Sequence, residues 1–425
     1  MGTVDLLVFV ILGALCYFAL RFSRFVYGDY FAPVGIFFGV NLASLAFYHL
    51  RLIPMVPLSS QAYALIAVAF FSFFTGALTA TPTVALRGQP LRKRASSRHV
   101  WNSKGLGLFY YFSACVALAG WVFFVTQIVP PGWVRNLWML QGDYEFPYHL
   151  GYTLVAGIAV PPSFVLLGAV RGKTTLPMIF FLITTVFALA IVGIKSYLTI
   201  AIATSLIVWA TIHPGRLKWK HLAFLALCLV GFMALYDHFI DIFVPRHFPG
   251  SRFPTILAFL ERPYLYLVGP WAAMSVVMAA PPPQAQWGQV TLFPLWKILG
   301  PGGLSVMERV PQYLPFVDIG PSMFNVYSLI GEVYWDWGWV GVILICFLLG
   351  FISTRLYVKA QNSRNWIDYL STGFFSYGLF ISFFAYYYRE TLIFLLIYPV
   401  VIGPLVSKLV SSLRVPRVRP VGIKI

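Results

Sequence analysis

The feature that most constrains this chain is a series of apolar runs, each long enough to cross a lipid bilayer as a helix. A bilayer core about 30 Å thick is crossed by roughly 20 helical residues. About eleven runs approach that length, near residues 4–20, 34–49, 62–80, 106–129, 152–170, 177–193, 197–212, 222–239, 337–356, 369–387 and 391–406. They predict an all-α polytopic membrane protein, with residues 1–425 forming a single integral membrane domain.

Composition supports this fold class. Of the 425 residues, 60% are hydrophobic and only 10% are charged, whereas soluble proteins are usually about 25% charged. A soluble enzyme with so much exposed apolar surface would aggregate, which excludes an ordinary cytosolic enzyme. The net charge of +17 comes from short basic joints between apolar runs. It therefore indicates membrane topology and lipid contact, and no nucleic-acid partner is expected.

The distribution of Lys and Arg predicts the orientation of the chain. The densest basic joint covers residues 87–104, and basic joints favour the cytoplasmic side. Alternating crossings from this joint place 21 of the 30 basic residues inside, with the N-terminus outside and the C-terminus inside. The same parity leaves 11 of the 13 acidic residues outside, so catalytic chemistry is expected to face outward.

The largest outward segment covers residues 241–326 and is rich in Pro, Gly and aromatic residues. Its part 264–280 is apolar, but a crossing there would move the basic C-terminal joints outside. We therefore expect a re-entrant or surface-lying helix near 264–280, ended by the three prolines at 281–283.

Basic residues on the outward side predict an anion site. Cations near membrane depth are costly unless an anion faces them, and guanidinium groups match phosphate oxygens. A phosphate or pyrophosphate is the expected partner, with pairing to outward acids as the alternative. For Lys195, in a short joint, snorkelling to lipid headgroups is the alternative role. The candidate ligands are Lys195, Arg246, Arg252, Arg262, Arg309 and Arg389.

Outward carboxylates supply candidates for a general base. Glu332 stands in an apolar aromatic stretch, where a desolvated carboxylate is a better proton acceptor. Asp336 precedes an apolar run and is expected to act as a helix N-cap or an organiser. The remaining candidates are Asp237, Asp241, Glu261, Glu308, Asp318 and Glu390. The chain has no P-loop, HExxH, GxSxG or paired Cys/His motif, so neither a zinc nor a nucleotide-phosphate site is predicted.

Residues 325–341 carry the pattern Asn-x-Tyr-Ser, then Gly-x-x-Tyr-x-Asp-Trp-Gly-x-x-Gly. This pattern resembles a stretch of bacterial oligosaccharide repeat-unit polymerases, the Wzy-type O-antigen polymerases. The joint Gly193-Ile194-Lys195-Ser196 is similar to the Gly-x-Arg-Ser/Gly step of that family, with Lys195 where Arg is usual. We call residues 325–341 the motif segment.

The resemblance implies a GT-C-like glycosyltransferase of the bacterial inner membrane, with a periplasmic N-terminus, a cytoplasmic C-terminus and residues 241–326 as a periplasmic loop. Donor and acceptor would be undecaprenyl-pyrophosphate-linked glycans, without a metal or other cofactor. A chain-length-regulating co-polymerase is a further partner that the resemblance allows. The predicted catalytic residues are Glu332, Asp336 and Asp318, and the predicted substrate-binding residues are the six cations above with Asn325, Tyr327 and Tyr334.

Two alternatives stay open on the sequence. An O-antigen ligase performs the same chemistry on a different acceptor. A lipid-linked oligosaccharide flippase belongs to another class and is expected to show paired repeats with broken helices in corresponding positions.

Overall fold

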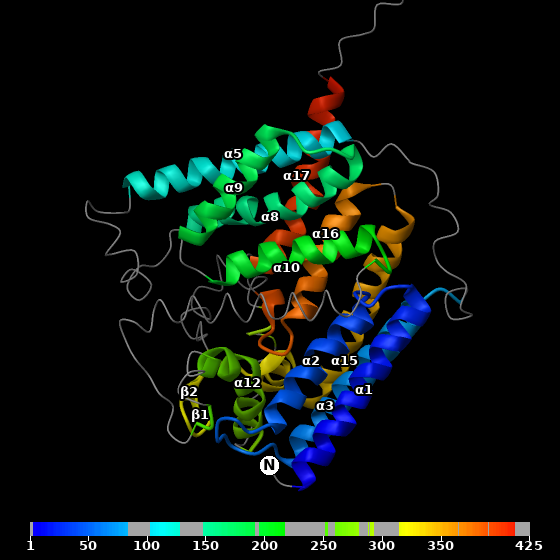
Figure 1. Ribbon diagram of the computed structural model, residues 1–425, viewed down its shortest axis with the longest axis vertical. Coiled ribbons are helices and arrows are strands. Elements are labelled where there is room, and N and C mark those ends of the chain that lie inside the picture. The colour runs from blue at the N-terminus through cyan, green and yellow to red at the C-terminus, as the bar shows by residue number, and fades with distance from the viewer. Residues whose placement is uncertain are drawn as a thin grey trace, which may run out of the picture. The chain divides into compact units, whose positions relative to one another are not determined.

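The computed structural model describes residues 3–83, 103–127, 148–191, 195–216, 251–253, 260–279, 288, 290–292, 314–363, 365–389 and 391–412. In these ranges the chain is mostly helical (Figure 1). The α-helices are α1 (Thr3–Tyr27), α2 (Pro33–His49), α3 (Ser60–Ala80), α5 (Ser103–Gln127), α8 (Tyr148–Arg171), α9 (Leu176–Ile191), α10 (Lys195–Ile212), α12 (Glu261–Ala279), α15 (Ser328–Asn362), α16 (Trp366–Phe380) and α17 (Thr391–Ser412). A 3₁₀ helix, η2, covers Tyr387–Arg389, and an antiparallel hairpin pairs β1 (Val317–Asp318) with β2 (Met323–Phe324).

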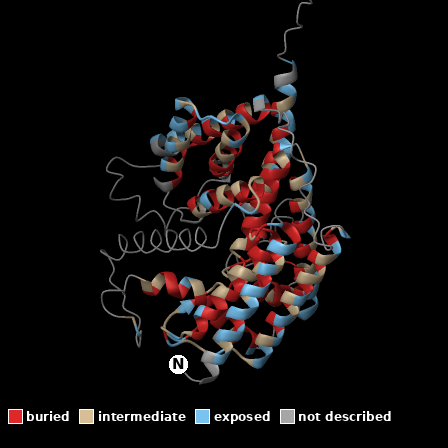
Figure 2. Ribbon diagram, turned by 45° about the vertical axis from the view of Figure 1, so that its right-hand side comes forward, coloured by how far each residue is buried: buried red, intermediate tan, exposed pale blue. Residues whose placement is uncertain are grey.

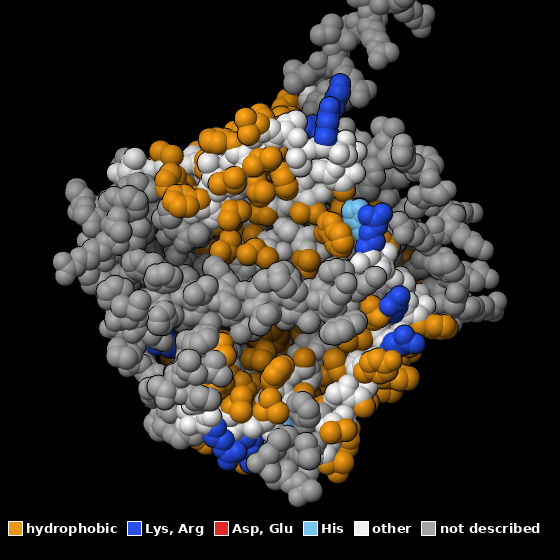
Figure 3. All heavy atoms as spheres, in the orientation of Figure 1, with side chains coloured by type: hydrophobic (Ala, Val, Ile, Leu, Met, Phe, Trp, Pro, Cys, Tyr) orange, Lys and Arg blue, Asp and Glu red, His pale blue; other side chains and the backbone are white. Residues whose placement is uncertain are grey.

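Five helical segments among the described residues are long and apolar enough to cross a membrane. They are Val10–Tyr27, Ser60–Ala80, Lys104–Phe123, Thr153–Arg171 and Ser328–Asn362. Several large apolar side chains on them face outward, including Phe18, Phe71 and Val340, each more than 70% exposed. Hydrophobic side chains also cover much of the described surface (Figure 3). Lipid tails are the solvent that such a surface requires, so the protein is membrane-embedded.

The chain divides into two compact units, where the sequence indicated one domain. The first unit comprises Met1–Ser97, Trp209–Ser363 and Thr372–Ile393. The second comprises Arg98–Val208, Arg364–Ser371 and Phe394–Ile425. Helices α10, α16 and α17 have residues in both units.

In the first unit α1 packs along α2, and α3 packs along α15. Glycines allow the second pair to approach at backbone distance: a Cβ on Gly76 would lie 2.0 Å from the Phe347 carbonyl oxygen, and one on Gly350 would lie 2.1 Å from that of Phe73. The Phe73 ring stacks on Phe37 of α2 at 4.1 Å between centroids. Buried residues accordingly lie on the inner faces of these helices and exposed ones on the outer faces (Figure 2).

The C-terminal ends of α1, α3 and α15 meet at one end of the first unit, which we call the basic end. Three hydrogen bonds join its parts: Tyr27 to Thr81 at 2.6 Å, the Tyr357 hydroxyl to Asp29 at 3.2 Å, and the Gln361 amide to the Thr211 carbonyl at 2.8 Å. Arg24 and Lys359 lie in the last turns of α1 and α15. The structure thus gathers joints that the predicted parity places on one side of the membrane.

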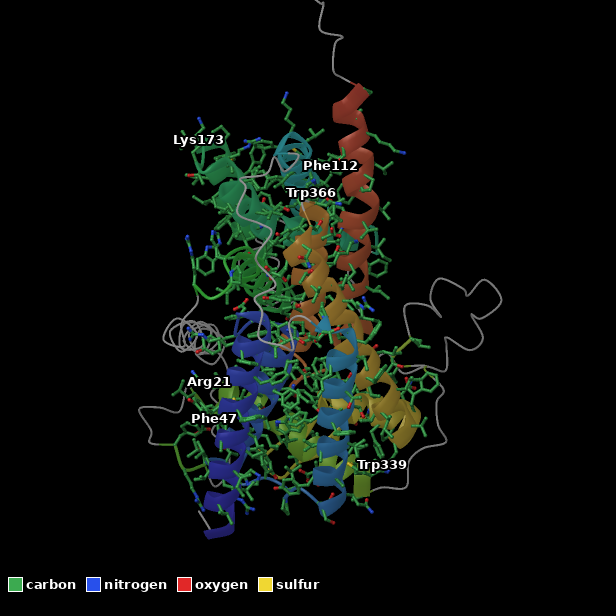
Figure 4. The ribbon with its side chains drawn as sticks, turned by 90° about the vertical axis from the view of Figure 1, so that its right-hand side faces the viewer. Arg21, Phe47, Phe112, Lys173, Trp339 and Trp366 are labelled. Atoms are coloured by element: carbon green, nitrogen blue, oxygen red, sulfur yellow. The ribbon has the colours of Figure 1, made fainter. Side chains whose placement is uncertain are left out.

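In the second unit α5 packs against α8 and α9. A Cβ on Gly120 would lie 2.3 Å from the Thr153 side chain, so α5 and α8 also approach closely through a glycine. Pro161 and Pro162 stand inside α8 without ending it, as membrane helices tolerate. Trp366, which is labelled in Figure 4, is buried, and its ring centroid lies 4.8 Å from that of Phe109.

Some predicted boundaries are wrong. The run expected to begin at residue 337 is the later part of α15, which begins at Ser328 and bends at Gly338 (φ 62°). The run 369–387 ends early, because α16 stops at Phe380 and a turn follows. A helix does cover the apolar part 264–280 of the large loop: α12 packs against α2 and α15. The run 222–239 and the prolines at 281–283 lie outside the described residues.

Candidate functional site

The motif segment forms the start of α15, and its first turn is tied to the turn that follows α16. Ser328 has a left-handed backbone (φ 61°), which is uncommon for a residue with a side chain. Its N–H donates to the Phe384 carbonyl at 3.0 Å, and the N–H of Leu329 donates to the Ser382 carbonyl at 2.8 Å. The Ser328 hydroxyl accepts the Gly331 N–H at 3.2 Å. Ser328 therefore caps the first turn of α15 through its hydroxyl. The next free N–H of the helix, that of Leu329, is bound by the Ser382 carbonyl.

Glu332 lies one turn further along α15 and is fully buried. Its Oε2 accepts the backbone N–H of Tyr386 at 3.2 Å. Tyr386 belongs to the stretch between α16 and α17, immediately before η2. A buried carboxylate is costly unless it is hydrogen-bonded or paired, so this contact joins α15 to the η2 region.

Asp336 is also fully buried, and both of its oxygens accept hydrogen bonds. Oδ1 accepts the Gly288 N–H at 3.1 Å, and Oδ2 accepts the Thr291 N–H at 2.8 Å and the Thr291 hydroxyl at 2.7 Å. The prediction that Asp336 is an N-cap is wrong, because α15 has already begun at Ser328. Instead the carboxylate organises a turn 45 and 48 residues earlier in the chain.

The two carboxylates stand four residues apart and therefore share one face of α15. Glu332 holds a segment 54 residues later in the chain, and Asp336 holds one that is 48 residues earlier. The start of α15 thus assembles two distant parts of the first unit around a buried acidic stripe.

Aromatic residues lie next to the two acids in the motif segment. The Tyr327 hydroxyl donates to the Pro315 carbonyl, and its ring lies 6.0 Å from that of Trp335. Burial, and then the negative charge of Glu332, raise the pKa of Tyr327, so its phenol stays protonated at neutral pH. Tyr334 is buried against Trp339, whose side chain is 38% exposed (Figure 4).

Two of the predicted phosphate ligands lie in segments that meet near the end of α2. The Arg252 N–H donates to the Leu52 carbonyl at 2.8 Å, next to the exposed Arg51. The Leu52 N–H in turn donates to the Tyr264 hydroxyl at 3.2 Å, two residues after Arg262. Figure 3 shows a second group of basic side chains at the lower end of the first unit, where α1 begins, which is opposite to the basic end. Arg389, a third predicted phosphate ligand, is the last residue of η2 and follows Tyr386 by three residues.

The remaining candidates fall elsewhere. Asp318 is exposed on the hairpin, where its Oδ1 accepts the Gly320 N–H at 2.8 Å and stabilises the turn. Asn325 is half-buried just before α15, and Glu261 is buried at the start of α12. Lys195 is the first residue of α10, in the second unit. Outside the described residues lie Arg246, Arg309, Asp237, Asp241, Glu308 and Glu390.

Thr291, which contacts both Asp336 and Trp337, could not be identified from the sequence. A threonine in a loop carries no periodic signal, and its partners are set only by tertiary packing. Ser328 belongs to the motif segment, but its capping role is visible only in the backbone geometry.

Among the described residues, no group of three or more His, Cys, Asp or Glu side chains is placed to hold a metal ion. Comparison with protein-family models, curated proteins and solved structures finds no match to this chain.

Proposed function

We propose that the protein polymerises undecaprenyl-pyrophosphate-linked oligosaccharide repeat units into O-antigen or a related surface polysaccharide. The observation that carries the proposal is the pair of fully buried carboxylates, Glu332 and Asp336, on one face of an apolar helix. Ionisable groups at membrane depth are costly and are retained for function. The resemblance of the motif segment supplies the reaction class.

In this proposal the hydroxyl oxygen of one lipid-linked glycan attacks the anomeric carbon of another. The bond from that carbon to the pyrophosphate oxygen breaks, and undecaprenyl pyrophosphate leaves with the electron pair. Glu332, which is fully buried and whose Oε2 accepts the Tyr386 N–H, accepts the hydroxyl proton. Asp336 organises the wall of the site.

The leaving pyrophosphate carries negative charge that the protein must stabilise. Fixed guanidinium groups meet such charge at little reorganisation cost. Arg252 and Arg262 are the described candidates in the first unit, and Arg389 follows the segment that Glu332 anchors. Lys195, Arg246 and Arg309 complete the proposed set.

The proposal includes a GT-C-like arrangement with about eleven crossings in the bacterial inner membrane. The N-terminus would be periplasmic, the C-terminus cytoplasmic, and residues 241–326 a periplasmic loop. The gathering of basic joints at one end of the first unit supports this orientation.

The test uses purified full-length protein in proteoliposomes with a synthetic undecaprenyl-pyrophosphate repeat unit. A ladder of products with increasing numbers of repeats, formed equally well in the presence of a chelator, is the expected result. Transfer only to an added lipid core would identify a ligase. Movement of the substrate across the bilayer without new glycosidic bonds would identify a flippase.

A further inference from the structure

The turn formed by Gly288 and residues 290–292 is bound to Asp336 of α15 by the N–H groups of Gly288 and Thr291 and by one side chain of the turn, that of Thr291. Its hydroxyl donates to Asp336 Oδ2 at 2.7 Å and accepts the indole N–H of Trp337 at 2.7 Å. Its backbone N–H donates to the same carboxylate oxygen at 2.8 Å. Thr291 is 3% exposed, so these contacts are shielded from water.

The chain of hydrogen bonds has one direction. An indole N–H can only donate and a carboxylate can only accept, so the Thr291 proton must point toward Asp336. Asp336 and Trp337 are consecutive helical residues, and their side chains leave the helix about 100° apart. A single hydroxyl that binds both therefore fixes two neighbouring side chains relative to each other.

Glycines make room for this arrangement. Gly288 has a left-handed backbone (φ 89°), and a Cβ there would lie 2.6 Å from the Trp337 ring. A Cβ on Gly341 would lie 2.0 Å from the Cβ of Trp337. The indole is thus enclosed between the turn and the next turn of α15, beside the bend at Gly338.

We infer that Thr291 is a positioning residue for glycan transfer. Its hydroxyl orients Asp336 and Trp337, so that the turn and the bend of α15 form one fixed wall of the glycan-binding site. Thr291 itself touches no substrate in this account. The inference rests on the proposed function for its catalytic readout, and on the hydrogen bonds for its structural one.

The catalytic test compares Thr291→Val, which removes the hydroxyl and keeps the shape, with Thr291→Ser, which keeps the hydroxyl. Thr204→Val on α10 is the matched control, because this buried hydroxyl has no hydrogen-bond partner among the residues that the structure describes. In the ladder assay we expect Thr291→Val to lower kcat about tenfold with little change in KM, as for the loss of one hydrogen bond to a charged group. Thr291→Ser and Thr204→Val should behave as wild type. Wild-type kcat in Thr291→Val, or equal losses in the Val and Ser variants, would overturn the inference.

A second measurement does not depend on turnover. Val290 is 5% exposed, so a cysteine at 290, in a protein without the four native cysteines, should react slowly with a water-soluble maleimide. Adding Thr291→Val should speed this labelling about tenfold by releasing the turn, and Thr291→Ser should not. Unchanged labelling would overturn the inference. If wild-type protein forms no ladder, the proposed function fails while the labelling result still decides whether Thr291 holds the turn.

Discussion

At the scale of single residues, the two motif acids differ in how they are held. Asp336 accepts hydrogen bonds at both oxygens from Gly288 and Thr291, whereas Glu332 Oε2 is anchored to the Tyr386 backbone. The sequence identified both acids because charged residues are rare in apolar stretches. It did not identify their partners, because these lie about 50 residues away in either direction and no local pattern encodes them.

Replacing Asp336 with Asn should destabilise the protein. The amide nitrogen of Asn cannot accept a hydrogen bond. In the variant it would replace one of the two carboxylate oxygens, so the N–H of either Gly288 or Thr291 would lose its acceptor on residue 336. We expect the free energy of unfolding to fall by about 1–3 kcal/mol. Thermal unfolding in detergent measures this, with the exposed Asp318→Asn as control, because an Asn oxygen can still accept the Gly320 N–H. Equal melting temperatures for the two variants would contradict the organising role of Asp336.

Asp29 makes stability depend on pH. It lies between α1 and α2, and burial raises its pKa from 3.8 to about 6, opposed by hydrogen bonds from Phe31 and Tyr357. The folded protein therefore holds this proton to higher pH than the unfolded chain does, so stability falls as pH rises from about 4 to about 6. The difference corresponds to about 3 kcal/mol.

Asp29→Asn removes this titration and can still accept the Phe31 N–H. Above pH 7 we expect it to melt at a higher temperature than the wild type, with the difference shrinking as pH is lowered toward 4. Melting curves across this range provide the measurement. A constant difference at every pH would show that Asp29 does not titrate in this window.

At the scale of elements, α15 shows what the apolar-run criterion misses. Residues 328–336 contain Ser328, Glu332 and Asp336, so the hydrophobic run was expected to begin only at residue 337. The helix begins earlier because the Ser328 hydroxyl caps its first turn and both acids have tertiary partners. Conversely, α16 stops at Phe380 although its sequence stays apolar, and carbonyls of the following turn accept the first N–H groups of α15.

The α3–α15 contact should depend on Gly76 and Gly350 together. A methyl group on either would collide with a carbonyl oxygen of the other helix, at 2.0 Å and 2.1 Å, so the helices must move apart. Each Gly→Ala change is expected to cost about 1–3 kcal/mol. The double variant should cost less than the sum, because the first separation makes room for the second methyl.

Melting temperatures of the wild type, the two single variants and the double variant together form a double-mutant cycle. Gly13→Ala on α1 is the control, since among the described residues no atom outside the neighbouring backbone of α1 lies within 4 Å of the added Cβ. It should leave stability unchanged or raise it slightly through helix propensity. Strictly additive losses at Gly76 and Gly350 would argue against a shared close approach.

At the scale of the whole molecule, composition and run length predicted a helical membrane protein, and the described residues confirm that coarse class. The division into two units was not predicted. It depends on which helices pack together, as α5 does with α8 and α9, and every run is apolar enough to pack with several others. Periodicity identifies helices, whereas close partners follow from glycine contacts such as that of Gly120 with Thr153.

Orientation is a property of the whole molecule and can be tested by labelling. Single cysteines at Ala95 and Gly302 lie in the dense basic joint and the large loop. In intact cells a membrane-impermeant maleimide should label residue 302 and not residue 95, because basic joints stay cytoplasmic. Position 302 is used because a cysteine in the turn at Gly288 would disturb the hydrogen bond to Asp336. Labelling of both positions, or of residue 95 alone, would reject the predicted parity.

The most direct test of the central claim is the product ladder formed by Glu332→Gln protein in proteoliposomes with the synthetic lipid-pyrophosphate repeat unit. Gln keeps the shape of Glu332 and can still accept the Tyr386 N–H, but it cannot take a proton from a sugar hydroxyl. We predict a ladder from wild-type protein and none from an equal amount of variant with a wild-type melting temperature. A ladder of wild-type intensity from Glu332→Gln would contradict the account.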